Sequence, residues 1–577
     1  MTTDRPTTLG SPALPGPRQA PAATGPAAAG PRRGFLAKAF GVTAVLSAAG
    51  SALGLLRDLL LARYFGANQG TDAFLVAWTV PETAAPLLIE DAMSFLMVPA
   101  FALALVLREE RPDGPDPVRQ LVRATLPWLL LALSTLSLGA ALGAPRLVDL
   151  LAPGLADPGL AVTCTRITAI TVLPFGVAGY LAAALRAHHR FTAPAGIYVA
   201  YNLGILGVLL TCHALWGVRA AAIGVAFGSV LMAGLLIGPF LRRLRSGGRR
   251  SGARRSRNAL VLIPLALLPV GVFTLTRQAQ VFIERFLGSA LPPGTISHLN
   301  YAAKVSQLAM TAGILICTVT FPLVARALAA GDVTAARDRV EKDLGQAAAV
   351  VLLGTAFLMA CAPSVVALLF ERGAFGPRDT AATAAVIRVY SFGLLAQALI
   401  GVMIRPYFSL RPVVRRAGDP SPEDGGRRLL DWYPAGAMAF GLVVTVTVGL
   451  LATPRFGALG LAAGNAAGIT ATAALLLHGL VLRGIPLRLR RVLGGHARLL
   501  ATATGAAALG TPVAGLAADP LLSTALGGLT VALAFAVLGT GLGAREVRGP
   551  VRAALRVLGP VPGPSPVADE GKPPHGC

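Results

Sequence analysis

The chain has 577 residues, of which 54% are hydrophobic and only 14% are charged, and its mean hydropathy is +0.66. Soluble domains carry about 25% charged residues, so the composition excludes an ordinary soluble protein and indicates an all-α integral membrane protein. The formal net charge of +24 would suit nucleic-acid binding. The basic residues, however, lie in loops between apolar segments, where they set membrane orientation, and we expect no nucleic-acid partner.

Fourteen apolar segments follow a first stretch rich in Pro, Ala and Gly, and each is near the length of about 20 residues that a transmembrane helix needs. They cover residues 35–57, 72–105, 122–143, 160–185, 193–215, 219–241, 259–285, 297–325, 346–370, 382–404, 433–452, 457–481, 499–517 and 520–543. The long second segment is expected to bend at Pro81.

These segments predict two pseudo-symmetric six-helix lobes plus two C-terminal helices. The expected divisions are a disordered cytoplasmic tail over 1–34, an N-terminal lobe over 35–241, a basic cytoplasmic linker over 242–258, a C-terminal lobe over 259–481, helices 13 and 14 over 482–543, and a second disordered cytoplasmic tail over 544–577.

The distribution of Lys and Arg predicts the orientation of these helices. With the N-terminus in the cytoplasm, 39 of the 51 basic residues fall on the cytoplasmic side and 5 on the other. Because positive charges concentrate in cytoplasmic loops, we expect a multi-pass protein of a bacterial-type cytoplasmic membrane with both termini inside.

Four charges lie within a short apolar stretch, SALGLLRDLLLARYFGANQGTDAF, at residues 51–74. They are Arg57, Asp58, Arg63 and Asp72. A charge at the bilayer centre costs about 2.5–3.5 kcal/mol on insertion scales, so the stretch is a candidate functional site. The competing interpretation is helix packing, with Arg57 and Asp72 forming a structural ion pair.

Part of this stretch recurs in the second half of the chain. ARYFG at 62–66 matches ERFLG at 284–288, and VPAFALAL at 98–105 matches FPLVARAL at 321–328. Because each half then holds six helices, the repeat is parallel, and substrates of such transporters bind between the repeats. The second copy carries intramembrane charges of its own at Arg277, Glu284, Arg285 and Lys304.

The run GLLRDLLLARYFGA, followed by TDAF, a proline, Glu90 and VPAF, resembles the MurJ/MviN family of lipid II flippases, within the larger group of fourteen-helix polysaccharide and multidrug exporters. The resemblance implies a two-lobed bundle that alternates between inward-open and outward-open states. It also implies a lipid-linked cell-wall precursor as cargo, an undecaprenyl diphosphate-linked sugar, with helices 13 and 14 forming a groove for its tail.

The resemblance also implies roles for particular residues. Those expected to bind cargo are Arg57, Asp58, Asp72, Lys304 and Arg63, the last with a snorkelling anchor as its alternative role. Those expected to act in coupling or gating are Glu90, Asp91 and Glu284. We find no catalytic motif, phosphate loop or metal-ligand cluster in the sequence, so we expect a transporter without cofactor. Uphill transport would draw on a Na⁺ or H⁺ gradient or on the membrane potential.

Several positions depart from the family pattern. Ser51, Ala85 and Pro86 stand where the family has arginine, and Glu82 and Asp91 add carboxylates. These departures keep an alternative open, an ion-coupled exporter of a drug, a secondary metabolite or another lipid-linked saccharide. A membrane scaffold for wall synthesis is a third hypothesis. The expected partners are a lipid-linked oligosaccharide or other amphiphile, membrane lipids and cell-wall synthesis proteins, around a monomeric chain.

Overall fold

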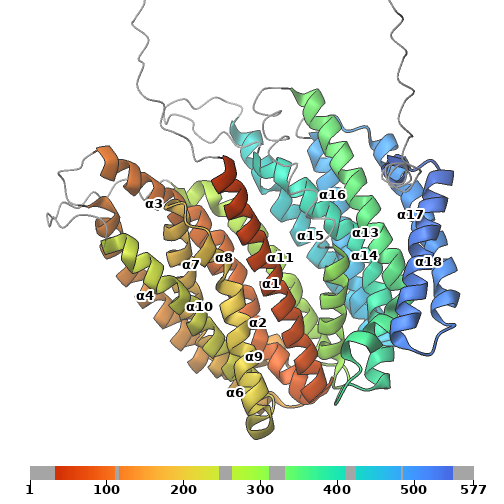
Figure 1. The fold of residues 1–577 in the computed structure, drawn as a ribbon, viewed down its shortest axis with the longest axis horizontal. Helices are drawn as coiled ribbons and strands as arrows, with labels where there is room; N and C mark the ends of the chain where they lie inside the picture. Colours follow the sequence, from red (N-terminus) through yellow and green to blue (C-terminus); the bar gives the residue numbers. More distant parts are fainter. Residues whose placement is uncertain are drawn as a thin grey trace, which may run out of the picture.

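The computed structural model describes residues 33–110, 116–245, 263–310, 332–409, 424–482 and 485–549. Within these ranges the chain forms helices joined by short turns, and no strand occurs (Figure 1). The predicted N-terminal tail and most of the predicted linker over 242–258 lie outside the described residues.

The first half of the chain forms one group of helices. Its elements are α1 (Arg33–Phe65), α2 (Gln69–Ala85), the π-helix η1 (Pro86–Ala92), α3 (Met93–Glu110), α4 (Pro117–Leu142), α5 (Ala144–Leu151), α6 (Pro158–Ala169), α7 (Val172–Ala187), α8 (Thr192–Ala195), α9 (Ile197–Trp216) and α10 (Arg219–Arg245).

The second half forms another group, followed by a C-terminal pair. Its elements are α11 (Ile263–Gly288), helical residues 295–310, α13 (Val333–Phe370), α14 (Pro377–Ser409), α15 (Asp424–Phe456), α16 (Ala458–Leu482), α17 (Leu489–Ala514) and α18 (Pro520–Gly541).

Each of the fourteen predicted segments coincides with helix among the described residues, and eleven helices there are long and apolar enough to cross a membrane. The other three predicted segments correspond to α11, to residues 295–310 and to α17. Of these three, the segments that contain α11 and residues 295–310 are only partly described, and Thr and Gly lower the hydropathy of α17. The all-helical membrane fold is therefore confirmed, while the count of fourteen spans stays a prediction.

The two groups repeat the same packing order. In the first, α1 packs on α9 and α9 packs on α10; in the second, α11 packs on α15 and α15 packs on α16. Figure 1 shows the two lobes side by side, with α1 between them and α17–α18 at the far edge of the second. This correspondence supports the two pseudo-symmetric lobes that the sequence predicts.

Glycines allow the paired helices to approach closely in both lobes. A Cβ on Gly204 of α9 would lie 2.5 Å from the Cα of Gly228 in α10, and one on Gly468 of α16 would lie 2.3 Å from the carbonyl oxygen of Gly441 in α15. Because lipid tails are as apolar as the helices, such close packing rather than water exclusion holds membrane helices together.

The second predicted segment is helical but changes helix type along its length. Pro81 lies inside α2, and the regular helix gives way to η1 at Pro86. Turns of π-helix accommodate an irregular backbone without ending the helix. The regular helix thus continues through Pro81 and the change of helix type falls one turn later, at the second proline, while the bend at Pro81 stays a prediction.

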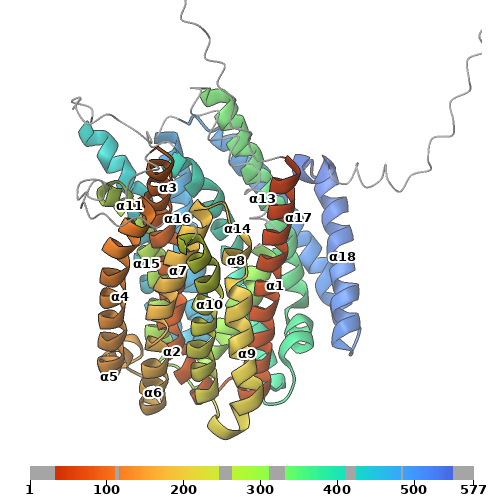
Figure 2. The same cartoon turned by 60° about the vertical axis from the view of Figure 1, so that its left-hand side comes forward.

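The C-terminal pair packs on α13 and extends beyond its predicted end. The two helices contact each other and α13, and Figure 2 shows them standing beside that helix. Residues 545–549 form a further short helix, in which Val547 is buried against Gly539. The predicted disordered tail thus cannot begin at residue 544, because this turn has an apolar surface to pack on.

Candidate functional site

Arg57 and Asp58 form an ion pair with each other inside the first lobe. The Nη2 and Nε atoms of Arg57 donate to Oδ1 of Asp58 at 2.7 and 2.9 Å. The guanidinium also lies over the ring of Trp78 in α2, 4.5 Å from its centroid. Both members of the pair are buried, at 8% and 5% exposure. The pair is therefore neutral as a unit, which lowers the cost of holding a charge in this position.

Asp72 reaches across to the second lobe. Its Oδ2 accepts from the backbone N–H of Gly294 at 2.6 Å, and its Oδ1 accepts from the N–H and the hydroxyl of Ser297 at 2.7 and 2.6 Å. The carboxylate therefore caps the helix that begins at residue 295, where unpaired N–H groups favour a negative charge. The alternative in which Arg57 pairs with Asp72 is wrong, because these backbone and hydroxyl donors occupy both carboxylate oxygens.

The lobes meet along residues 63–72, 289–298 and 373–376, which we call the interlobe belt. The backbone N–H of Ala374 donates to the carbonyl oxygen of Arg63 at 2.8 Å. The hydroxyl of Tyr301 donates to the carbonyl oxygen of Gly66 at 3.4 Å. The belt lies at the lower end of Figure 1, where α1 ends and α2 begins.

Arg63 belongs to this belt rather than to the buried charges. It lies six residues after Arg57, about 9 Å further along α1 at 1.5 Å per residue, and its side chain is exposed. A Cβ on Gly373 would lie 2.3 Å from the carbonyl oxygen and 3.1 Å from the Cγ of Arg63. This placement matches the alternative role as an anchor near the end of the helix better than the predicted contact with cargo.

Glu82 of α2 forms the centre of a second link between the lobes. Its Oε1 lies 3.5 Å from Nζ of Lys304, and its Oε2 lies 3.8 Å from Nη2 of Arg285. Gln278 of α11 donates to the backbone carbonyl oxygen of Glu82 at 3.3 Å. Lys304, predicted to bind cargo, therefore faces the first lobe as expected, but a carboxylate of the chain already occupies its neighbourhood.

Glu90 and Asp91 lie in η1, which packs on α7. Glu90 is exposed and accepts from the hydroxyl of Tyr198 in α9 at 2.5 Å. This bond stays within the first lobe. The side chain of Asp91 lies outside the described residues, so its predicted role in coupling or gating stays a prediction.

Glu284 lies in α11, apart from the Glu82 link. Its Oε1 accepts a short hydrogen bond from Nδ2 of Asn465 in α16, and Gln280 and Tyr390 lie within interaction range of the carboxylate. The structure thus places Glu284 among polar side chains of the second lobe. Its predicted role in coupling is untested.

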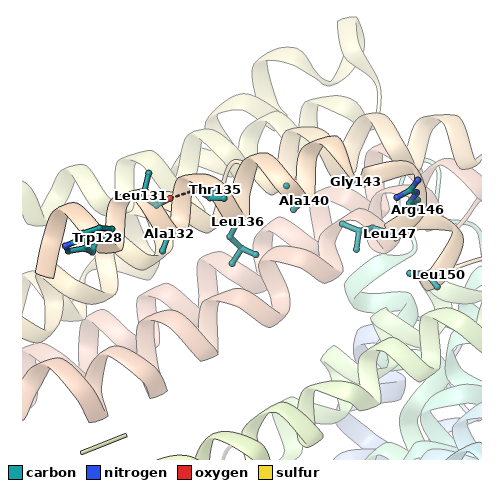
Figure 3. Close-up of a pocket in the computed structure, with 11 residues that line it drawn as sticks. Trp128, Leu131, Ala132, Thr135, Leu136, Ala140, Gly143, Arg146, Leu147 and Leu150 are labelled. Carbon is teal, nitrogen blue, oxygen red and sulfur yellow. Dashed lines mark hydrogen bonds between the residues drawn. The ribbon is translucent and has the colours of Figure 1, made fainter. Parts of the chain in front are cut away.

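A groove of about 790 Å³ lies on the outer face of α4 and α5, away from these charges (Figure 3). Its walls are mostly apolar, and Arg146 stands at one end. Trp128 and Leu136 are exposed there. In a membrane this face suits contact with acyl chains, and it contains none of the residues predicted for the site.

The structure brings together charges that the sequence places far apart. Arg57, Asp58, Glu82, Arg285 and Lys304 form one interlobe charge cluster, since Arg57 is within electrostatic range of Glu82. Glu82, Arg285 and the supporting Trp78 were not among the predicted site residues. For Glu82 the signal was present, because a carboxylate inside an apolar segment meets the same criterion that selected Arg57.

The sequence matches the family described as lipid II flippase MurJ over residues 61–415. It is 31% identical over 369 residues to a probable lipid II flippase MurJ of Rhizobium meliloti (strain 1021), covering 62% of this chain and 67% of that protein. A lipid II flippase MurJ of Burkholderia cenocepacia is 28% identical over 391 residues, covering 62% and 70% of the two chains.

Solved structures share the fold. A lipid II flippase MurJ in an inward closed conformation superposes with a TM-score of 0.68 at 16% identity, covering 87% of this chain and 99% of that one. An inward-facing multidrug MATE transporter gives 0.60 at 14% identity, covering 76% and 95%. The resemblance read from the helix 1–2 motif is confirmed by the matched residues, and the chain belongs to the lipid II flippase MurJ family of multi-pass membrane proteins.

Proposed function

We propose that this protein moves a lipid-linked cell-wall precursor, a lipid II-like polyprenyl diphosphate sugar, from the cytoplasmic to the outer leaflet of the bacterial cytoplasmic membrane. Cargo of this kind carries an anionic diphosphate on an apolar tail. The observation that supports the proposal is the interlobe charge cluster, in which cations from both lobes meet: Arg57 from α1, and Arg285 and Lys304 from the second lobe.

Arginine suits a diphosphate because its planar fork can donate to two oxygens at once. In Arg57, Nε and Nη2 donate to Asp58, which fixes the orientation of the guanidinium and directs its three remaining N–H donors, two of them on Nη1. A buried, oriented cation loses little entropy when it binds an anion, so the pair acts as a preorganised half of a headgroup site.

The transport cycle we propose is alternating access of the two lobes, with both termini in the cytoplasm. In that orientation the interlobe belt holds the two lobes together at the outer side of the membrane. The energy source we propose is an ion gradient or the membrane potential, worth about 2.3 kcal/mol per charge per 100 mV.

The test is complementation of a bacterial strain depleted of its own lipid II flippase. We expect the wild-type chain to restore growth and Arg57→Ala to abolish it, with Arg57→Lys intermediate because it keeps the charge but loses the fork. Arg146→Ala, in the groove of α4 and α5, is the matched control. Failure of the wild-type chain, expressed at normal levels in the membrane, would remove the lipid II proposal.

A second candidate is the ion-coupled exporter, and Glu82 favours it because a carboxylate among the cations lowers the positive charge offered to an anion. Deletion in the native host separates the two. Lysis or a change of cell shape supports the flippase, whereas hypersensitivity to one class of compound with an intact wall supports the exporter.

A further inference from the structure

Glu82 is a residue of the first lobe, and both of its ion pairs among the described residues are made with cations of the second lobe. Lys304 and Arg285 approach its carboxylate, and Gln278 donates to its backbone oxygen. The side chain is partly buried, at 22% exposure. It therefore ties α2 to α11 and to the helix over 295–310 by charge, at a place away from the interlobe belt.

The link is made at distances longer than hydrogen bonds. Charge-assisted N–H···O bonds measure about 2.7–2.9 Å, whereas these pairs stand at 3.5 and 3.8 Å. Oε2 of Glu82 is buried without a hydrogen-bond partner in the part of the chain described, and so is Nε of Arg285. Nη2 of Arg285 donates to Oδ1 of Asn300 at 3.4 Å, but Oε2 of Glu82 and Nε of Arg285 carry the cost of burial without a hydrogen bond. Another anion with better reach can therefore exchange for the carboxylate.

The balance of charges around Glu82 also favours exchange of its carboxylate for another anion. Arg57 and Asp58 neutralise each other, so within the Glu82 link Lys304 and Arg285 supply two positive charges and Glu82 cancels one of them. Glu284, next to Arg285 and within its electrostatic range, is hydrogen-bonded to Asn465 of the second lobe. A diphosphate linking a lipid to a sugar has one ionised oxygen on each phosphoryl group. It matches both cations when the Glu82 carboxylate moves out of the cluster, and it is repelled by that carboxylate while it remains.

We propose that Glu82 is the resident counter-anion of the cargo site: it holds Lys304 and Arg285 in the empty protein, and the diphosphate displaces it. Displacement removes the charge link between α2 and the second lobe, so cargo binding itself frees the lobes to move. Glu82 is accordingly a specificity and positioning residue. This inference rests on the proposed function, since it takes the diphosphate headgroup as the displacing anion.

The experiment uses the purified full-length chain in lipid nanodiscs with farnesyl diphosphate as the probe. Binding is followed by isothermal titration calorimetry, and hydrogen exchange of residues 295–305 reports the state of the interlobe link. We expect Glu82→Gln to bind the probe about tenfold more tightly, a modest share of the repulsion between unit charges at these separations. The same variant should exchange faster at 295–305 without probe, because its link is already cut.

Asp149→Asn, an exposed carboxylate of α5, is the matched control and should behave as wild type in both measurements. In the double variant Glu82→Gln/Lys304→Gln the net charge of the cluster returns to that of wild type, and we expect the affinity to return with it. If Glu82→Gln fails to fold, Glu82→Asp replaces it; its shorter side chain keeps the charge but reaches the cations less well, so binding should still tighten.

The outcomes separate the two proposals. Wild-type binding with no gain in Glu82→Gln overturns the counter-anion role and leaves the proposed function standing. Failure of wild type and variant alike to bind the probe overturns the diphosphate cargo, and with it the displacement step. Unchanged exchange at 295–305 in Glu82→Gln overturns the claim that this carboxylate links the lobes.

Discussion

Asp72 supplies an acceptor that the helix over 295–310 lacks in its own sequence. The preceding residues are Pro292, Pro293 and Gly294, none of which has a side chain able to accept a hydrogen bond. The first N–H groups of a helix need acceptors, and here the carboxylate comes from the other lobe. One residue therefore completes a helix and closes an interface.

Replacing Asp72 should loosen this helix in proportion to the acceptors removed. Asp72→Ala loses all three hydrogen bonds, whereas in Asp72→Asn the amide oxygen still accepts from Ser297 and the amide nitrogen cannot accept from Gly294. Loss of an N-cap costs about 0.5–2 kcal/mol, so we expect hydrogen exchange over 290–300 to rise about 2- to 30-fold in the alanine variant and less in the asparagine variant. Equal exchange in both variants and wild type would contradict the capping role.

The sequence was sufficient to find the costly charges but not their partners. Arg57, Asp72 and Lys304 stood out because each lies in an apolar segment. Arg57 pairs with its neighbour Asp58, but the partners of Asp72 and Lys304 lie more than 200 positions away, in the pairs Asp72 with Gly294 and Glu82 with Lys304. Periodicity and composition carry no information on such contacts, so the site was predicted as a region and not as a set of pairs.

At the scale of elements, the helices were predictable because a bilayer admits few alternatives. Every polar backbone group in the membrane must be paired within its own segment, so a long apolar run becomes a helix. The exceptions are local. The π-turn at η1 begins at Pro86, and its Ile89 contacts α7 close to Gly179. The proline is visible in the sequence, whereas the contact with α7 is not.

Tight turns at the belt give a prediction with an internal control. Gly66 has φ +66° and a Cβ there would lie 2.6 Å from the carbonyl oxygen of Ala374 in the other lobe. Gly457, after α15, has φ +54° and open space around it. Alanine in the left-handed region costs about 1–2 kcal/mol in backbone strain, but only Gly66→Ala also displaces the second lobe. We expect a lower apparent Tm for Gly66→Ala than for Gly457→Ala, measured on detergent-purified protein by fluorescence size-exclusion after heating.

Extra hydrogen exchange at residues 373–376 should accompany the lower Tm of Gly66→Ala and be absent from Gly457→Ala. If the two variants lose the same stability, the belt yields to a methyl group and does not form a close contact. That result would also weaken the case for the belt as a closed gate.

At the scale of the whole molecule, two different kinds of contact hold the two lobes together. The belt joins backbone to backbone and to Asp72 at one end, whereas the Glu82 link is an exchangeable charge pair. A cargo that displaces Glu82 leaves the belt as the remaining barrier on that route. We expect the charge link to open first, because an anion competes for it, and the belt to open second, because it has no such competitor.

Alternating access predicts that the belt separates when cargo binds. We would place spin labels at Ala156 of the first lobe and Arg372 of the second, both exposed near the belt, in a variant with the five native cysteines replaced. Double electron–electron resonance in nanodiscs should give one short distance without ligand and a second, longer population with farnesyl diphosphate. Glu82→Gln should shift toward the longer population at lower probe concentration, since binding to it is tighter. A single unchanged distance under every condition, with binding verified on the same sample, would contradict opening of the belt and with it the proposed transport cycle.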